Sequence, residues 1–358
     1  MGGKCVIRIC NVESRLLSTP LKNAFITSRD IEPRSFAHRV EIKLYLTDGT
    51  SGVGEVVPVS YVTGETLESV QRDIEVCSEA IAGMEATTPV SVMAGLAPLL
   101  THSPSTLAGL EIALYDLCCK INGITLWSHL GGAIKRVTTD LTLSITPEAP
   151  EIAQQAAISG FKIFKMKVGG SDPGQDLARI LAVHRAVPEA VIRLDANQAY
   201  TASQALRFID IVVKAGVNLE LVEQPVAWDD LSALDEVAKN SSVPIVADES
   251  VKSPADALRV LSETSVHGIN IKLMKSGLNG ALDIITLARL AGRQLMLGCM
   301  LESRRGISSS LALACGTGAF TWIDLDGHLL LDEPGENGFF REEGPNLNIV
   351  PSLPNSNC

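Results

Sequence analysis

The sequence predicts an α/β protein in which an α+β capping domain precedes a TIM-like (β/α)8 barrel. From about residue 138, short apolar runs of strand length alternate with segments of helical period. Eight such runs occur, and their ends follow at intervals of 22 to 28 residues, the length of a repeated strand–loop–helix unit. Eight parallel strands with helical crossovers close into a barrel, whereas a doubly wound open sheet, the alternative, rarely carries eight such even units.

The first third of the chain begins with the pattern of antiparallel strands. Residues 6–12 and 38–55 alternate between apolar and polar side chains, and Asp48-Gly49 marks a turn within the second segment. Residues 20–30 are expected to form a loop that covers the catalytic face of the barrel.

Helices follow these strands. We expect one over residues 65–84 and a second over residues 105–120, where leucines, isoleucine and alanines form a broad apolar face. Ser105 is the expected N-cap of the second helix, and Gly123 is its expected stop signal.

The predicted strands also set the domain boundaries. We expect a capping domain over residues 1–125, a barrel over 126–327, and a C-terminal segment over 328–358 that returns to the capping domain. In such a barrel the catalytic face lies at the carboxyl ends of the strands. The eight predicted strands cover residues 141–145, 161–168, 190–197, 219–225, 244–250, 268–274, 294–300 and 321–327.

Composition and charge exclude several classes of function. The chain has 358 residues, with 30 Lys plus Arg against 41 Asp plus Glu and a formal net charge of −11. It therefore lacks the basic surface of a protein that binds nucleic acid or an anionic membrane. No apolar stretch approaches the roughly 18 residues of a membrane span, and no signal peptide is recognisable. The eight cysteines match no zinc spacing, so we expect reduced thiols and a cytoplasmic location.

Charged side chains gather where the predicted strands end. A single charge at a strand end is usually a solvated loop residue, but independent accidents would scatter the charges along the strands and mix their signs. Two of the strands end in like-charged pairs with a spacing of two, which places both members on one face. Six of the eight strands end in charge, at Lys165 and Lys167, Asp195, Glu223, Asp248 and Glu249, Lys272, and Asp324 and Asp326.

Three of these carboxylates predict a metal site. Asp195, Glu223 and Asp248 end consecutive strands, and their oxygens suit a hard cation, Mg2+ or alternatively Mn2+. The competing interpretation is a set of helix N-caps and loop charges. Lys167 and Lys272 would lie on opposite sides of the cation, unless they only form salt bridges to the same carboxylates. Two amines in that arrangement can remove a proton from one face of a carbon and return it to the other.

The motifs around these residues form a recognisable set. They are KMK (165–167), LDAN (194–197), VEQP (222–225), ADES (247–250) and INIKLMKSG (269–277). In this order they resemble the enolase superfamily, in its muconate-lactonising subgroup, and the resemblance covers nearly the whole chain. Thr125 departs from the proline that many relatives carry, at a turn without a chemical role.

The resemblance implies a role for each of these side chains. Asp195, Glu223 and Asp248 would bind Mg2+. Lys167 and Lys272 would be the acid/base pair, and Lys165 would help to hold the substrate carboxylate and depress the pKa of Lys167. The step shared by such enzymes is abstraction of the α-proton of a carboxylate to give an enediolate that the metal stabilises.

The aspartates at the eighth strand end direct the choice of substrate. Asp324 and Asp326 would form an acidic wall suited to the free ammonium of a dipeptide, unless they only cap the following loop. The DLD motif and residues 54–66 resemble the signature and the mobile substrate loop of dipeptide epimerases. This implies epimerisation of L-Ala-D/L-Glu or a related dipeptide by two-base 1,1-proton transfer. N-acyl amino acid racemase, muconate cycloisomerase and o-succinylbenzoate synthase are the alternatives within the subgroup.

Three further residues are assigned to substrate binding. Cys299 ends the seventh strand, Thr142 lies in the first, and Arg29 in the covering loop could meet a glutamate side chain. The expected partner is therefore a small dipeptide, and the sequence leaves a homo-oligomer open.

Two rival functions use other chemistry. A lyase or aldolase would use Lys167 or Lys272 as a Schiff-base amine and needs no site of three carboxylates. A barrel that had become a non-catalytic binding protein would have lost a base or a ligand, whereas every motif position is filled here.

Overall fold

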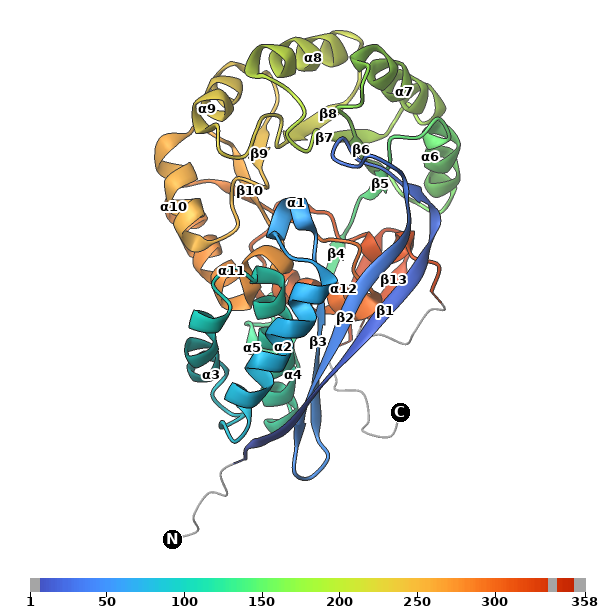
Figure 1. Ribbon diagram of the computed structural model, residues 1–358. Helices are drawn as coiled ribbons and strands as arrows, with labels where there is room; N and C mark the ends of the chain where they lie inside the picture. Colours follow the sequence, from blue (N-terminus) through green and yellow to red (C-terminus); the bar gives the residue numbers. More distant parts are fainter. Residues whose placement is uncertain (1–6, 334–339, 351–358) are drawn as a thin grey trace.

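The computed structural model describes residues 7–333 and 340–350, and it confirms the predicted fold class (Figure 1). A three-stranded antiparallel sheet with its helices forms the N-terminal part, and a curled parallel sheet of eight strands forms the larger part. Helices surround the curled sheet, and a long hairpin of the N-terminal part reaches to it, with its tip near β6 (Figure 1).

The strands of this hairpin are longer than the sequence pattern predicts. β1 (Ile9–Phe25) pairs antiparallel with β2 (Arg34–Leu46), which in turn pairs with β3 (Ser51–Val56). The expectation of a loop over residues 20–30 is wrong in its first half. β1 continues to its last residue because pairing with β2 resumes there, after an irregularity that begins at Pro20.

The helices of the N-terminal part follow the prediction closely. The turn before β3 contains Gly49 with a φ of +87°, as the Asp-Gly pair indicates. The predicted helix over residues 65–84 is α2, and Gly123 follows the end of α4 with a positive φ. The helical segments are α1 (Ser60–Thr63), α2 (Leu67–Ile81), α3 (Pro89–Leu96), the 3-10 turn η1 (Ala97–Leu99), α4 (Pro104–Ile121) and α5 (Leu126–His129).

The start of α4 corrects one prediction. The helix begins at Pro104 with Ser103 in the N-cap position, so Ser105 is not the N-cap. Proline is well suited to the first helical position because its missing N–H would be unpaired there anyway. The backbone N–H groups of Ser105 and Thr106 instead donate to the buried carboxylate of Glu65, at 2.8 and 2.9 Å.

The two parts of the molecule share α4. Leu110 and Leu114 of this helix pack into the core of the N-terminal part, and Ile112 and Tyr115 pack into the core of the barrel. A helix that is apolar on nearly every side is stable only between two such cores. The broad apolar face seen in the sequence therefore fixes the N-terminal part against the barrel.

The barrel strands confirm the predicted repeat, because each of the eight apolar runs contains a strand. In chain order they are β5 (Leu141–Leu143), β6 (Ile163–Lys167), β7 (Val191–Asp195), β8 (Leu219–Glu223), β9 (Ile245–Ala247), β10 (Gly268–Ile271), β11 (Gln294–Leu297) and β12 (Trp322–Ile323). The helices between them are α6 (Ala149–Ile158), α7 (Pro173–Ala186), α8 (Ala202–Lys214), α9 (Leu231–Asn240), α10 (Pro254–Glu263), α11 (Leu273–Leu290) and α12 (Arg304–Thr317).

Side chains connect the first and last strands of the curled sheet. The Leu325 N–H donates to Thr139 Oγ1 at 2.8 Å, and the Thr142 N–H donates to Asp326 Oδ2 at 2.5 Å. Arg193 on β7 adds a bond from Nη1 to the Ile323 carbonyl at 2.8 Å. These bonds draw the segment after β12 towards β5 and hold its aspartate at the carboxyl end of the barrel.

The segment after β12 contacts both parts of the molecule. It passes through the 3-10 turn η2 (Gly327–Leu330), and the Asp332 N–H donates to the Pro20 carbonyl of β1 at 2.8 Å. Further on, β13 (Phe340–Glu343) pairs with β14 (Asn346–Ile349), and β14 pairs with β4 (Arg136–Thr138) just before the barrel. The division of the chain after residues 125 and 327 stays a prediction.

The described cysteines form no disulfide, and the described helices include no membrane span. None of the helices in residues 7–333 and 340–350 combines the length and apolar character needed to cross a bilayer. Cys5 and Cys358 lie outside the described residues. The six described cysteines are free thiols: Cys10, Cys77, Cys118, Cys119, Cys299 and Cys315.

Close contact between β3 and α4 gives a test of the fold. A Cβ on Gly54 would lie 1.9 Å from the Gly109 carbonyl oxygen, so Gly54→Ala should destabilise the protein by about 1–3 kcal/mol. Gly95→Ala, on the exposed side of α3, meets only the end of the Met84 side chain at 3.5 Å and is the matched control. Thermal unfolding should show a lower midpoint for Gly54→Ala alone. Equal midpoints for both variants would contradict this packing.

Candidate active site

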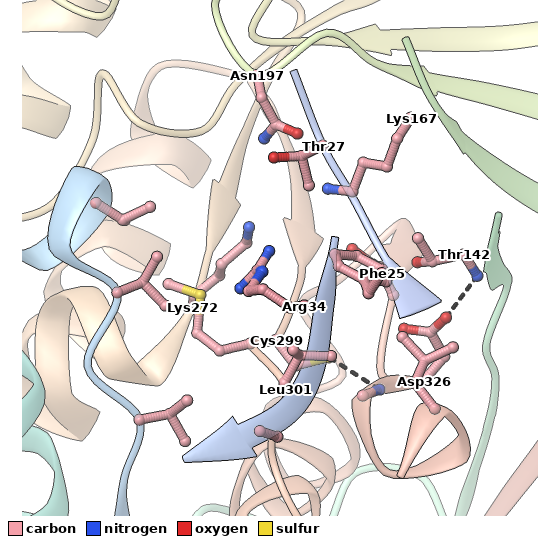
Figure 2. A pocket seen from close by; sticks show the side chains of 18 of the residues that line it. Phe25, Thr27, Arg34, Thr142, Lys167, Asn197, Lys272, Cys299, Leu301 and Asp326 are labelled. Atoms are coloured by element: carbon pink, nitrogen blue, oxygen red, sulfur yellow. Dashed lines mark hydrogen bonds between the residues drawn. The ribbon is translucent and has the colours of Figure 1, made fainter. Parts of the chain in front are cut away.

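A pocket opens at the carboxyl ends of the barrel strands, beneath the N-terminal hairpin. Lys167 and Lys272 enter it from different sides, and Phe25, Thr27 and Arg34 enter it from the hairpin (Figure 2). The pocket is thus built by both parts of the molecule. The barrel supplies charged and polar side chains at its floor: Thr142, Lys165, Lys167, Asn197, Asp248, Glu249, Lys272, Cys299, Asp324 and Asp326.

The three predicted metal ligands meet below this floor. Asp195 and Glu223 are the last residues of β7 and β8, and Asp248 directly follows β9. One oxygen of each lies within 4.8 Å of the others, and each residue is at most 1% exposed. The ends of adjacent parallel strands lie side by side, which is why residues far apart in sequence converge here.

Mutual repulsion and the surrounding lysines decide the charge of this cluster. Burial, together with Asp195 and Asp248, raises the pKa of Glu223 to about 8. Burial also acts to raise the pKa of Asp195, but Lys167 and Lys165 outweigh it and bring the pKa to about 2. For Asp248, Lys272 and Lys275 outweigh burial and hold the pKa well below its usual range.

The two predicted bases lie on opposite sides of the barrel. β6 and β10 are four positions apart in the order of eight strands, so their ends face each other across it. The Lys167 Nζ lies 2.5 Å from Asp195 Oδ2, and the Lys272 Nζ lies 2.7 Å from Asp248 Oδ2. Burial acts to lower the pKa of Lys272, but Asp248 outweighs it and the pKa is raised. A dication at the same carboxylates would oppose that effect, because it compensates their charge.

Lys165 lies in the middle of the acidic groups. Its ammonium is 2.6 Å from Asp324 Oδ2, 2.7 Å from Glu223 Oε2 and 3.1 Å from Asp195 Oδ2. Lys165 therefore compensates Asp324, one of the two aspartates that were predicted to meet the ammonium of a substrate. The role of Lys165 towards a substrate carboxylate stays a prediction.

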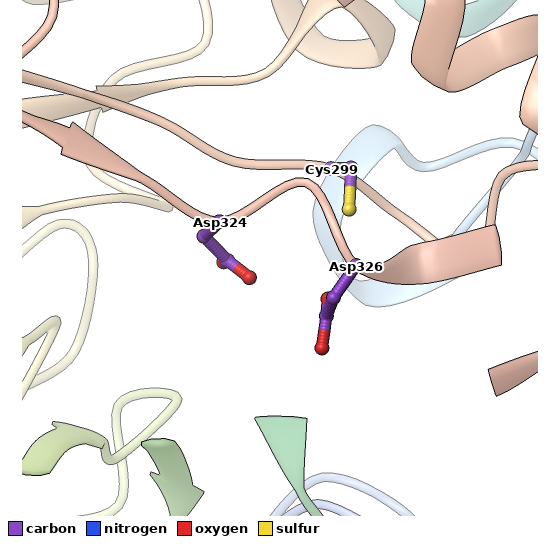
Figure 3. Close-up of side chains that lie close together, drawn as sticks. All are labelled: Cys299, Asp324 and Asp326. Atoms are coloured by element: carbon purple, nitrogen blue, oxygen red, sulfur yellow. The ribbon is translucent and has the colours of Figure 1, made fainter. Parts of the chain in front are cut away.

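Asp326 is the less compensated member of the aspartate pair. Its carboxylate accepts the Thr142 backbone N–H, and burial together with Asp324 raises its pKa to about 7. Asp324, Asp326 and the Cys299 sulfur point to the same side (Figure 3). The Cys299 sulfur accepts the Gly327 N–H at 3.3 Å, so it lines this wall without reaching a polar side chain.

The hairpin brings a different arginine into the pocket from the one predicted. Arg29 is exposed, does not line the pocket, and donates from Nε to the Asn197 carbonyl at 2.9 Å. Arg34 lines it instead, with its guanidinium over the Phe25 ring and its Nε 3.1 Å from Asp30 Oδ1. The cause is the extended pairing of β1 with β2, which makes Arg34 a strand residue facing the barrel.

Two buried polar residues of the site were also missed. Asn270 on β10 donates to Glu223 Oε1 at 2.7 Å, and Lys275 near the start of α11 donates to Asp248 Oδ1 at 2.5 Å. Both belong to the INIKLMKSG motif, so the motif contained the signal. The spacing of three between Lys272 and Lys275 did not reveal that both side chains reach the same aspartate.

The donor set of this centre fits a hard divalent cation. Three carboxylates offer oxygen ligands without thiolate or imidazole, which is the set that Mg2+ and Mn2+ prefer. Glu223 Oε2 is buried and pairs with the Lys165 ammonium at 2.7 Å. A bound dication would take over part of this compensation, and Asp195, Glu223 and Asp248 are the residues that would hold it.

Comparison with known proteins shows to which family the chain belongs. The family model described as Enolase C-terminal domain-like matches residues 148–345. The chain belongs to this family. It is 32% identical to the L-Ala-D/L-Glu epimerase of Thermotoga maritima over 344 aligned residues. The alignment covers 96% of this chain and 99% of that relative. The prediction of the enolase superfamily and of similarity to dipeptide epimerases is confirmed.

Solved structures agree with this assignment. A substrate-liganded complex of the L-Ala-D/L-Glu epimerase from Bacillus subtilis has a TM-score of 0.92 at 32% identity, covering 96% of this chain and 97% of the other. The dipeptide epimerase of Enterococcus faecalis V583, complexed with Mg and the dipeptide L-Leu-L-Tyr, has a TM-score of 0.91 at 32% identity, covering 96% and 98%. These family members share the whole fold, including the N-terminal part.

A buried glutamate beside the pocket gives a pH-dependent prediction. Glu302 is 0% exposed, its Oε2 has no hydrogen-bond partner, and burial raises its pKa from 4.5 to about 8. Between these pH values the folded protein binds a proton that the unfolded chain has lost. The wild type should therefore lose stability relative to Glu302→Gln as pH rises, by up to about 1.4 kcal/mol per pH unit.

Thermal unfolding of the metal-free protein between pH 5 and 9 measures this effect. Glu75→Gln, on the exposed side of α2, controls for the substitution itself. Unfolding midpoints of wild type and Glu302→Gln that change in parallel across the range would contradict the prediction.

Proposed function

We propose that this protein is an isomerase, a Mg2+-dependent dipeptide epimerase that acts on L-Ala-D/L-Glu or a related dipeptide. The observation that carries the proposal is the position of two lysines, Lys167 and Lys272, on opposite sides of a buried centre of three carboxylates. Family members with the same fold are named as dipeptide epimerases, and one of them is complexed with Mg and a dipeptide.

The two lysines account for inversion at carbon. When bound, a divalent cation would supply positive charge that makes the α-proton of a carboxylate more acidic. One neutral lysine takes this proton from one face of the α-carbon, and the protonated lysine opposite delivers its own proton to the other face. One proton leaves the carbon and one arrives, so the configuration inverts while composition is unchanged. The lysines exchange protonation states and can act in either direction.

The aspartate wall suits the ammonium end of a dipeptide. Asp326 is buried and accepts from Thr142, whereas Asp324 is paired with the Lys165 ammonium. A substrate ammonium donating to Asp326 would supply the missing positive charge. Muconate, succinylbenzoate and N-acyl amino acids have no such group, which disfavours the three alternative activities.

The hairpin supports the choice of an acidic second residue. Arg34 is a cation of the pocket that does not contact the metal-binding carboxylates, although Asp30 compensates part of its charge. Phe25 and Leu301 beside it supply apolar surface. An acidic side chain that reaches Arg34 would gain a charge-assisted bond, whereas a lysine side chain would be repelled.

Isotope exchange tests the function directly. The protein is incubated in D2O with Mg2+ and a set of dipeptides that includes L-Ala-L-Glu, L-Ala-L-Leu and L-Ala-L-Lys. We expect one deuterium at the α-carbon of the second residue, epimerised product, and a preference for glutamate. EDTA should abolish the exchange, which a Schiff-base enzyme would retain. Absence of exchange with every dipeptide would reject the proposal and leave a non-catalytic barrel.

Replacing each base in turn should separate the two faces of the reaction. Lys167→Ala and Lys272→Ala should each reduce epimerisation by on the order of 10²–10⁴-fold, because general acid–base catalysis contributes about that factor. Each variant should still exchange the α-proton of the one epimer whose proton faces the remaining lysine. Chiral separation combined with mass spectrometry measures both quantities. Near wild-type epimerisation in either variant would exclude the two-base mechanism.

The ammonium pocket can be tested by removing the charge of the protein's aspartate or the charge of the substrate's ammonium. Asp326→Asn and N-acetylation of the dipeptide each remove one partner of a charge-assisted bond worth roughly 1.5–3 kcal/mol. Each should lower kcat/KM about tenfold to a hundredfold, and the two losses should not add. Asp210→Asn, at an exposed pair with Lys214, is the control substitution. Equal turnover of acetylated and free dipeptide would favour an N-acyl amino acid racemase.

A further inference from the structure

The two oxygens of each metal-site carboxylate have different surroundings. Asp195 Oδ1 accepts the Asn197 backbone N–H at 3.0 Å, and Glu223 Oε1 accepts Asn270 Nδ2 at 2.7 Å. Asp248 Oδ1 accepts Lys275 Nζ at 2.5 Å. The second oxygen of each carboxylate contacts instead the lysines of the proposed reaction, Lys165, Lys167 or Lys272. One oxygen is therefore fixed by the scaffold, and the other faces the reaction centre.

Lys275 is fully engaged by the scaffold. An ammonium has three N–H donors, and this one has three acceptors: Asp248 Oδ1 at 2.5 Å, the Asp248 carbonyl at 2.7 Å and the Asn270 carbonyl at 2.9 Å. Three acceptors require three protons, so the geometry is that of the charged form.

Lys272 contacts the same aspartate but is held less firmly. Its Nζ donates to Asp248 Oδ2 at 2.7 Å, and Glu223 Oε1 is further away at 3.9 Å. It also lines the pocket, whereas Lys275 does not. The two lysines of the INIKLMKSG motif therefore have different positions, one available to a substrate and one enclosed behind the aspartate.

We propose that Lys275 and Asn270 are positioning residues of the metal site, which fix one oxygen of Asp248 and of Glu223 so that the other oxygen is presented to the cation. Lys275 also keeps a positive charge beside the Asp248 carboxylate when the Lys272 amine moves away from that carboxylate to act on substrate. The inference rests on the metal site of the proposed function, but not on the identity of the substrate. Partners of this kind typically contribute 10–100-fold to metal affinity.

Mn2+ binding to the metal-free protein tests this without substrate. Titration followed by electron paramagnetic resonance should give a dissociation constant about 10–100-fold higher for Lys275→Met than for wild type. Lys275→Arg, which keeps the charge, should lose less. Lys214→Met removes a lysine that is 2.6 Å from an aspartate on the exposed helix α8, and it should bind Mn2+ as wild type does. Circular dichroism establishes that each variant is folded.

The outcomes separate this inference from the proposed function. Mn2+ binding by folded Lys275→Met as tight as that of wild type would overturn the positioning role, whatever the substrate. If Lys275→Met does not fold, Asn270→Ser carries the test, and unchanged Mn2+ binding there would overturn it equally. Tight wild-type binding, weak variant binding and no dipeptide exchange would reject the proposed function alone.

A metal-rescue measurement distinguishes positioning from general damage. If dipeptide exchange is observed in wild type, raising Mg2+ should restore kcat in Lys275→Met, because the variant loses affinity for the cation and keeps both bases. A loss of kcat that saturating Mg2+ does not restore would count against the proposal.

Discussion

Three carboxyl groups buried within 4.8 Å of one another are the constraint on which the site depends. Carboxylates removed from water repel each other and are stable only beside compensating cations. Lys165, Lys167, Lys272 and Lys275 supply these cations, each within 2.7 Å of one of the carboxylates. The same ion pairs would be replaced in part when a dication is bound. The lysines therefore compensate the carboxylates when no metal is bound, and a bound dication would release Lys167 and Lys272 for the proposed proton transfer.

The N-terminal part completes the site from above but contributes no residue to the carboxylate centre. Its helix α4 divides its side chains between two cores, and Glu55 on β3 accepts the Ser303 N–H at 2.9 Å at the start of α12. The N-terminal part is thus held on the barrel by apolar packing and by hydrogen bonds such as that from the Ser303 N–H to Glu55. Its pocket residues, Phe25 and Arg34 among them, do not belong to the carboxylate centre. We therefore propose that the barrel carries out the reaction and that the hairpin selects the side chain of the substrate.

Hydrophobic periodicity predicted the barrel strands well, but it did not predict the full length of the N-terminal hairpin. Strand ends were readable because an apolar run that stops at Lys167, Asp195 or Glu223 marks both the strand and its functional end. The extent of the hairpin was harder to predict, because Pro20 interrupts the strand pattern of β1. The pairing with β2 is irregular from this residue and resumes only at Phe25. The assignment of Arg29 instead of Arg34 followed from that error. Ser105 looked like a cap because a proline before it was not counted as the first helical residue.

The sequence by itself determined the class of fold, the order of the strands and the residues that end them, because these depend on local patterns along the chain. Only the tertiary structure decided which charges meet. Lys165 pairs with Asp324 across 159 positions, and Lys275 reaches Asp248 across 27. Such pairings depend on the curvature of the curled sheet and on the direction of each side chain, which no local pattern encodes. The physical reason is that a buried charge is compensated by whatever lies near it in space, and the curling of the sheet makes distant strand ends neighbours.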